Sequence, residues 1–478
     1  MYAGVRTEPI GELYPFQELK HDPHMTENSV EPVLFEDIFH KPVLSQFDSE
    51  LRSSNGGASL LGAIDRRIKL TEGLCSHLMD KRDPARVEHS YLELLRLRVY
   101  ALGLGYPDGN DSARIGQDPA MKLLCGRGPA DGGSLASQPT LSRFEHGLSG
   151  REIVSLGRGL EETVIDRVRS RHPRARIVTI DLDPSVDPTH GQQPLAFFNG
   201  HYDTWCYLPM FGLLSVDGDP EQYLFHARLR SGLAKEAKGT IALLRRTVGR
   251  LRRAFKKAKI RVRLDAGFAY PQIFEVLEEL RVEYVVAMPR NSVLSDRAAR
   301  HMYAARVFTE SFESTTTLFG ESRYRTRSWK RERRVIFKAE VVHGEGQSAR
   351  DNARFVVTNL RHKPERVWKI YCQRGDSENR IKELKNDLEI DRTSCTSFLA
   401  NQVRVLLTST AYVLFQELRA VLRATELERG MLSTLRLKLL KIGATITESV
   451  RRVVVSMPSS HPWKDLWVKA ARRVSALA

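Results

Sequence analysis

The stretch YCQRGDSENRIKELK, residues 371–385, holds four side chains whose types and spacing could bind phosphate and a metal ion. In one continuous helix, Tyr371, Arg374, Glu378 and Lys385 would lie within about 60° of one another around the axis. The arginine fork and the lysine ammonium suit phosphate, the tyrosine can donate a hydrogen bond, and the glutamate can bind a cation. The alternative is a solvated helix face held by ion pairs, which is the more common role of such a pattern.

Gly375 lies inside this stretch, and because glycine is unfavourable in a helix interior, it argues against one continuous helix. A cap at Asp376 or Ser377 would start the regular helix there. Tyr371 and Arg374 would then lie in the turn that leads into the helix.

Two further carboxylates are expected where strands end. In RIVTIDLDPS, the alternation of a strand places Thr179, Asp181 and Asp183 on one face. In IRVRLDAGF, an alternating strand ends at Asp265, next to a flexible turn. Either aspartate alone could be a turn former. Together, Asp183, Asp265 and Glu378 could hold two divalent cations through oxygen ligands, and such ions would activate the attacking oxygen and stabilise the leaving oxygen of a phosphodiester.

The elements that must position these residues follow from the hydrophobic periodicity. Strands and helices alternate over residues 151–300, which predicts an α/β sheet. Period-two segments over 301–362 predict a small β-rich subdomain inserted in that α/β domain. Helical periodicity dominates from residue 32 to about 124 and again after 363. A Gly- and Ser-rich stretch, residues 126–150, separates the N-terminal helices from the α/β region.

The overall charge favours a polyanionic partner. The chain has 478 residues, with 74 Lys and Arg against 58 Asp and Glu and a net charge of +16. Nucleic acid and an anionic membrane surface are the two partner classes that fit. The most apolar stretch, VRVLLTSTAYVLF, is interrupted by Arg404, so we expect no membrane-spanning helix. The start lacks a secretory signal, and five scattered cysteines indicate reduced thiols in a soluble intracellular protein.

A basic tract could contact DNA. ESRYRTRSWKRERR carries seven basic residues, and Arg323, Arg325 and Arg327 would share one face of an expected strand. Trp329 follows, and an exposed Trp beside basic residues could stack on an unpaired base near a cleaved end. Packing of Trp329 in the core is an equally good interpretation. GRLRRAFKKAKIRVR has eight basic residues and no acid, and could contact the DNA backbone or form a solvated helix end.

These motifs belong to a longer resemblance. Tyr371, Arg374, Glu378 and Lys385 match in type and spacing the Tyr-x2-Arg-x3-Glu-x6-Lys signature of a group of DDE transposases of bacterial insertion sequences. The chain resembles this group also in DLDPSVDPTHGQQ, FNGHYDTWCYLPM, RLDAGFA, RFVVTNL and LKLLKIGATITESVRR, and in the N-terminal LASQPTLSRFEH. The resemblance therefore covers most of the chain.

The resemblance implies an RNase H-like catalytic core in which Asp183, Asp265 and Glu378 are the catalytic residues and the ligands of two Mg²⁺ ions, for which Mn²⁺ can substitute. The family pattern Asp-x-Asp-x-Thr places the metal ligand at the second aspartate, which favours Asp183 over Asp181. Two departures are Ser185 and Ala266, which stand where the family commonly has Thr and Ser. Neither removes a carboxylate.

The activity implied is cut-and-paste transposition. Water would free a 3′-hydroxyl at the element's end, and that hydroxyl would attack target DNA. The expected partners are double-stranded DNA at the inverted-repeat ends and the target, and a second copy of the chain in a homodimeric DNA complex at the bacterial nucleoid in the cytoplasm. Alternatives are a metal-dependent nuclease without strand transfer and an inactive DNA-end-binding protein. The expected DNA-binding residues are Tyr371, Arg374, Lys385, Trp329, Arg323, Arg325 and Arg327.

We therefore expect an α/β fold in five regions. They are a mainly helical DNA-binding region over 1–150, the first part of the RNase H-like core over 151–300, the β-rich subdomain over 301–362, the second part of the core with the Glu378 helix over 363–425, and a helical C-terminal region over 426–478.

Overall fold

The structure is a computed structural model that describes residues 33–35, 43–45, 51–235, 237–344 and 347–477. Residues 1–51 form one unit and residues 52–478 form a second, compact unit. In the first unit, β1 (Val33–Phe35) pairs antiparallel with β2 (Val43–Ser45). Helix was expected from residue 32, and this expectation is wrong here because short valine-containing segments favour extended backbone.

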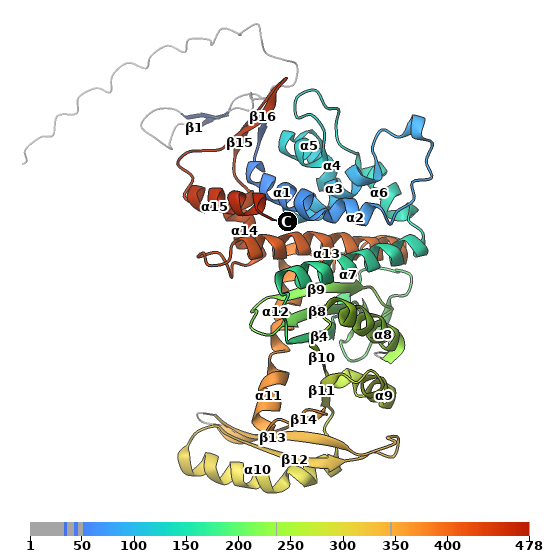
Figure 1. Ribbon diagram of the computed structural model, residues 1–478, viewed down its shortest axis with the longest axis vertical. Helices are drawn as coiled ribbons and strands as arrows, with labels where there is room; N and C mark the ends of the chain where they lie inside the picture. The colour runs from blue at the N-terminus through green and yellow to red at the C-terminus, as the bar shows by residue number, and fades with distance from the viewer. Residues whose placement is uncertain (1–32, 36–42, 46–50, 236, 345–346, 478) are drawn as a thin grey trace, which may run out of the picture. The chain divides into compact units, whose positions relative to one another are not determined.

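One mixed sheet of eight strands runs through the second unit, in the order β12-β13-β14-β11-β10-β4-β8-β9 (Figure 1). Its centre is parallel: β4 (Ile177–Pro184), β10 (Lys259–Leu264) and β11 (Glu283–Met288) run in the same direction. On the other side of β4, the hairpin of β8 (Met210–Val216) and β9 (Gln222–Arg228) pairs antiparallel. The expected α/β class is confirmed.

The β-rich segment continues this sheet. It consists of β12 (Thr316–Tyr324), β13 (Arg333–Gly344) and β14 (Gln347–Thr358), and β14 pairs antiparallel with β11. The insertion therefore extends the core sheet through backbone hydrogen bonds. Its first part is not β-rich as expected, because α10 (Ser292–Phe312) contains many good helix formers and is capped by Asn291, which accepts a hydrogen bond from a backbone N–H of the first turn.

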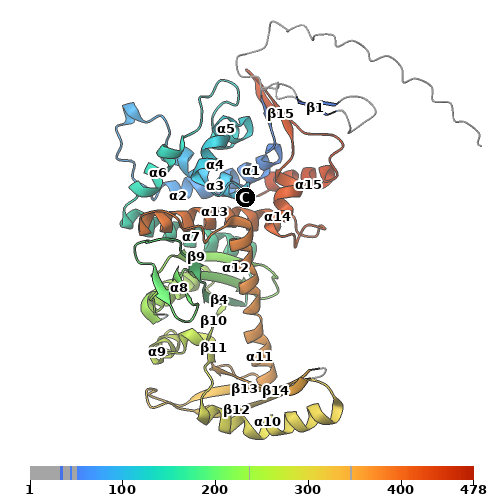
Figure 2. The ribbon, with the colours of Figure 1, turned by 180° about the vertical axis from the view of Figure 1, so that it is seen from behind.

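Helices cover the sheet, as the views in Figures 1 and 2 show. In the N-terminal part, the first five lie within residues 32 to about 124, where helical periodicity predicts helices, and the next two follow beyond that range. They are α1 (Ser59–Ile68), α2 (Leu70–Cys75), α3 (Tyr91–Gly103), α4 (Gly109–Arg114), α5 (Pro119–Cys125), α6 (Gln138–Gly147) and α7 (Gly150–Arg171). Further helices are α8 (Ala237–Ala254), α9 (Pro271–Glu279), α11 (Pro364–Cys372), α12 (Gly375–Leu388), α13 (Phe398–Val421), α14 (Leu432–Leu435) and α15 (Lys464–Ser475). One hydrophobic core extends from the N-terminal helices through the sheet to α15. Because this core is continuous, it marks no boundary inside the unit, and the expected domain limits stay predictions.

The edge strand β9 is protected by α13, which runs along it (Figure 1). The amide of Gln402 accepts a hydrogen bond from the Leu229 N–H at 2.6 Å and donates one to the Ala227 carbonyl at 3.3 Å. Gln416 makes the same kind of paired contact further along the strand. Two side-chain amides thus bond the backbone groups that an edge strand leaves unpaired.

The composition of α13 reflects its place in the core. Within the described residues it is the one helix that is long and apolar enough to cross a membrane, and 83% of its apolar window is buried inside the protein. Tyr412 and Phe415 on this helix are fully buried. Packing in the core accounts for its apolar sequence.

The C-terminal region is only partly helical. β15 (Ala444–Ser449) and β16 (Arg452–Ser456) form a hairpin, and β3 (Arg52–Ser53) pairs with β15. The expectation of a helical region over 426–478 is wrong for this hairpin, because ATITES and RVVVS are rich in β-branched residues that favour strands.

Candidate active site

Asp183 and Asp265 lie side by side at the carboxyl ends of two parallel strands. The register of β4 and β10 pairs Leu182 with Leu264. Asp183 is the next residue of β4, and Asp265 directly follows the end of β10. Asp183 is buried, with 7% of its surface exposed. The backbone N–H of Gly267 donates to Asp265 at 2.8 Å, so the turn after β10 holds this carboxylate in place.

The signature residues come from two helices and not from one. Tyr371 lies in the last turn of α11, which ends at Cys372, and α12 starts at Gly375. Arg374 is the residue that precedes α12, and Glu378 lies in the first turn of that helix. The single continuous helix is therefore wrong, and the break lies at Gln373 and Arg374, just before the glycine. The expected cap at Asp376 or Ser377 is also wrong, because α12 already starts at Gly375.

Arg374 joins the carboxylates. Its guanidinium lies 3.0 Å from Oδ2 of Asp183 and 3.4 Å from Oε1 of Glu378. It is also close enough to Asp265 to lower the pKa of that carboxyl. The hydroxyl of Ser377 donates to the same Asp183 oxygen at 3.3 Å. Three predicted metal ligands therefore surround one positive charge.

Burial is the main cause of the raised pKa values of two of these acids. The pKa of Asp183 is raised to about 7, by burial and to a lesser extent by the charges of Asp265 and Glu378, against the lowering effect of Arg374. Burial also raises the pKa of Asp265, against the lowering effect of Arg374. Acidic side chains are thus gathered in a partly buried site, and a bound cation would stabilise their charged forms.

Asp181 has a different partner. It is fully buried and forms a two-pronged ion pair with Arg263 on β10, with N–O distances of 2.8 and 2.6 Å. Arg263 also donates to the Ile370 carbonyl at 3.0 Å and to the Gln373 side chain at 3.2 Å, so it attaches the end of α11 to the sheet. Sequence reasoning missed this residue. The available signal was an arginine in the buried alternation of IRVRLD.

Lys385 does not join the carboxylates. Its ammonium donates to the Val186 carbonyl and lies 3.9 Å from Asp391. Nearby, Asp187 is fully buried and accepts a hydrogen bond from Thr393 at 2.9 Å. Lys385 therefore attaches α12 to the loop that follows β4.

The basic tract differs from expectation at two points. β12 ends at Tyr324, so Arg323 is in the strand, whereas Arg325 and Arg327 follow it and do not share its face. All three are exposed. Trp329 is 2% exposed, and its ring lies 5.1 Å from that of Phe274. The interpretation of Trp329 as an exposed stacking residue is wrong, because α9 supplies an apolar surface that buries it.

The donor chemistry of the site fits hard divalent cations. Asp183, Asp265 and Glu378 offer carboxylate oxygens, which Mg²⁺ and Mn²⁺ prefer. Within the described ranges, no group of three His, Cys, Asp or Glu side chains is already arranged to hold a metal ion. The position between the carboxylates is taken by the Arg374 guanidinium, which would have to move aside.

A family comparison decides the class of protein. The profile of the family described as transposase DDE domain, group 1, matches residues 35–478. The chain belongs to this family. The expected DDE transposase is thus confirmed, while the narrower signature group stays a prediction. Transposases cut DNA and transfer its strands.

Other comparisons add little to this assignment. No curated protein matches this transposase. A solved structure of the piggyBac transposase, in a synaptic complex with hairpin DNA, has 10% sequence identity and a TM-score of 0.40, over 80% of each chain.

Proposed function

We propose that this transposase binds the ends of its own insertion sequence, cuts the DNA there and joins the freed ends to target DNA. The observation that carries the proposal is the convergence of Asp183, Asp265 and Glu378 on Arg374 where two parallel strands end. Three acidic side chains in this arrangement suit metal-assisted phosphodiester chemistry. Two copies of the chain, acting on the two ends, would form the active homodimer.

The finer fold assignment in this proposal is an RNase H-like core. The strand order β9-β8-β4-β10-β11 supports it, with an antiparallel meander followed by parallel strands. The carboxylates lie beyond the carboxyl ends of the parallel strands, where open α/β sheets commonly form their sites.

The roles of the side chains follow from their surroundings. Asp183, Asp265 and Glu378 would hold the divalent ions, which activate the attacking oxygen and stabilise the leaving oxygen when bound. Arg374 would exchange its carboxylate partners for the phosphate, to which its planar fork is well suited. Tyr371, half-buried beside Arg374, can donate its hydroxyl to the same phosphate. Lys385 would hold the loop after β4, next to Asp183, in place.

The direct test uses purified protein, Mg²⁺ and DNA that carries the inverted repeats bordering the reading frame. Joined strands would support the transposase proposal, and hairpin products would show how the second strand is cut. Nicks without joining would indicate a nuclease, and binding without cutting would indicate an inactive end-binding protein. Absence of binding to these ends would overturn the proposal.

Substitutions at α11 and α12 separate chemistry from recognition. Glu378→Ala should abolish cleavage and leave end binding equal or tighter, because a negative charge facing DNA is removed. Arg374→Ala should weaken binding of the cut DNA end or misplace that end, because a phosphate contact is lost. Glu365→Ala and Arg366→Ala remove the same charges at exposed positions of α11 and serve as controls. Cleavage at the normal rate by Glu378→Ala would contradict the assigned metal ligand.

A further inference from the structure

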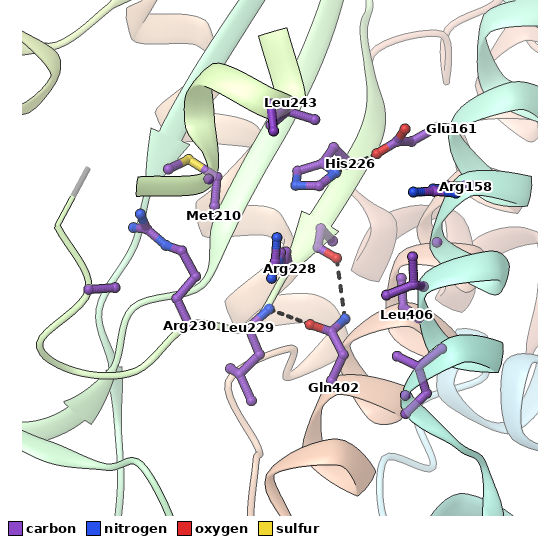
Figure 3. A pocket seen from close by; sticks show the side chains of 18 of the residues that line it. Arg158, Glu161, Met210, His226, Arg228, Leu229, Arg230, Leu243, Gln402 and Leu406 are labelled. Atoms are coloured by element: carbon purple, nitrogen blue, oxygen red, sulfur yellow. Dashed lines mark hydrogen bonds and ion pairs between the residues drawn. The ribbon is translucent and has the colours of Figure 1, made fainter. Parts of the chain in front are cut away.

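A cavity of about 580 Å³ lies beside the edge strand β9, bounded by α7, α8 and α13 (Figure 3). Its walls are largely apolar and include Met210, Leu229, Leu243 and Leu406. The size is typical of a site for a small molecule or one unit of a polymer (about 300–1,000 Å³). None of the three predicted metal ligands lines it.

Besides Arg246, which is paired with Glu161, three arginines line this cavity (Figure 3). Arg158 comes from α7, Arg228 ends β9, and Arg230 follows two residues later. The Arg230 side chain donates to the Leu208 carbonyl at 2.8 Å, which fixes its position. Arg158 and Arg228 are exposed and have no hydrogen bond or ion pair within the part of the chain that the structure describes.

The acid in the lining is already neutralised. Glu161 accepts hydrogen bonds from His226 at 2.6 Å and from Arg246 at 2.7 and 3.1 Å. Burial alone would raise the pKa of Glu161, but these two partners more than offset it and the pKa is lowered. The charge that remains for a ligand is therefore positive.

The cavity and the carboxylates lie at the same end of the sheet but on opposite faces. Asp183 pairs with Phe211, and the side chain of the preceding residue Met210, which lines the cavity, points to the other face. Pro184, the residue after Asp183, pairs with Met210 on β8, and Met210 pairs with Arg228 on β9. Two strand spacings of about 4.8 Å put the Arg228 backbone about 10 Å from that of Pro184. Arg230 is close enough to Asp265 to lower the pKa of that carboxyl. A DNA strand cut at the carboxylates could therefore reach the cavity by passing around this end of the sheet.

We propose that this cavity binds an unpaired nucleotide of the DNA strand that is cut at the neighbouring carboxylates, an inference that rests on the proposed function. The base and sugar lie against the apolar wall, and Arg158 and Arg228 bind the flanking phosphates. A single unpaired nucleotide exposes both the flat apolar base and the anionic backbone. In a duplex the base faces are covered by stacking, so paired DNA does not fit this combination of groups.

The test compares two end DNAs of the same sequence, one fully paired and one with a short unpaired tail at the cleavage position. Affinities are measured by fluorescence anisotropy. The double variant Arg158→Ala/Arg228→Ala should bind the tailed DNA about tenfold more weakly, since it removes both charge-assisted phosphate contacts. Its affinity for paired DNA should change by less than about twofold.

A second variant fills the cavity without removing charge. Ala242→Trp at the exposed rim should also weaken binding of the tailed DNA selectively. The double variant Lys469→Ala/Arg472→Ala on α15 controls for the loss of two exposed positive charges. Equal losses on both DNAs, or no loss in either variant, would overturn the proposal. A protein that fails to bind or cut the paired end would contradict the proposed function instead.

Discussion

At the residue scale, two aspartates two positions apart on β4 have different roles because their arginine partners differ. Asp181 is enclosed by Arg263 inside the sheet, whereas Asp183 faces other carboxylates. Asp181→Asn leaves the buried Arg263 without a counter-charge and should destabilise the protein by about 3–5 kcal/mol. It should keep measurable cleavage below its lowered melting temperature.

The matching variant Asp183→Asn should abolish cleavage and change the melting temperature less, since burial of that carboxylate is already unfavourable. Thermal unfolding and a cleavage assay at low temperature test both variants. Loss of cleavage in Asp181→Asn with a normal melting temperature would move the metal ligand to Asp181.

Asp187 should make stability depend on pH. Burial raises its pKa to about 8 from 3.8, Thr393 and Lys385 oppose this, and Asp391 adds to it. Between about pH 4 and pH 8 the folded chain holds a proton that the unfolded chain has released, so this contribution to stability falls as pH rises. The melting temperature of the unchanged protein, relative to Asp187→Asn, should therefore fall from about pH 5 to about pH 8. A constant difference would contradict the raised pKa.

At the element scale, Trp329 joins the β12–β13 hairpin to α9. Its ring contacts Phe274 and Tyr324, and the Arg333 guanidinium lies 4.8 Å from its centre. Trp329→Ala should cost about 3–5 kcal/mol of folding free energy, measured by urea unfolding, and Trp329→Phe less. Arg327→Ala, at an exposed position, should change stability by no more than about 0.5 kcal/mol.

DNA binding distinguishes the two interpretations of this tryptophan. A residue in the core should leave the DNA affinity of the folded fraction unchanged when it is replaced by Phe. A selective loss of affinity for unpaired DNA in Trp329→Phe, with normal stability, would restore its role as a stacking residue.

At the scale of the whole molecule, the net charge of +16 should make DNA binding strongly salt-dependent. Lys and Arg contacts release counterions from the phosphates, so the logarithm of the association constant should fall linearly with the logarithm of salt concentration. Anisotropy titrations with end DNA over a range of NaCl concentrations measure the slope. A DNA affinity that does not change with salt concentration would contradict a role of the net charge in binding phosphates.

The sequence by itself determined the local elements and most of the residues of the candidate site. The alternation in RIVTIDLD and IRVRLD predicts two strands with Asp183 and Asp265 at their ends, and the structure has them there. Gly375 likewise indicates a break nearby, although the break lies just before it, at Gln373 and Arg374. These signals are local, since strand alternation and helix breaking depend on neighbouring residues.

Only the tertiary structure decided which side chain meets which. Asp181 and Arg263 are 82 residues apart in sequence, and Trp329 is buried by an element far from its own hairpin. Lys385 contacts a loop carbonyl, where a phosphate was expected. Burial and pairing of this kind depend on how the helices lie against the sheet, and no local pattern of residue types contains that information.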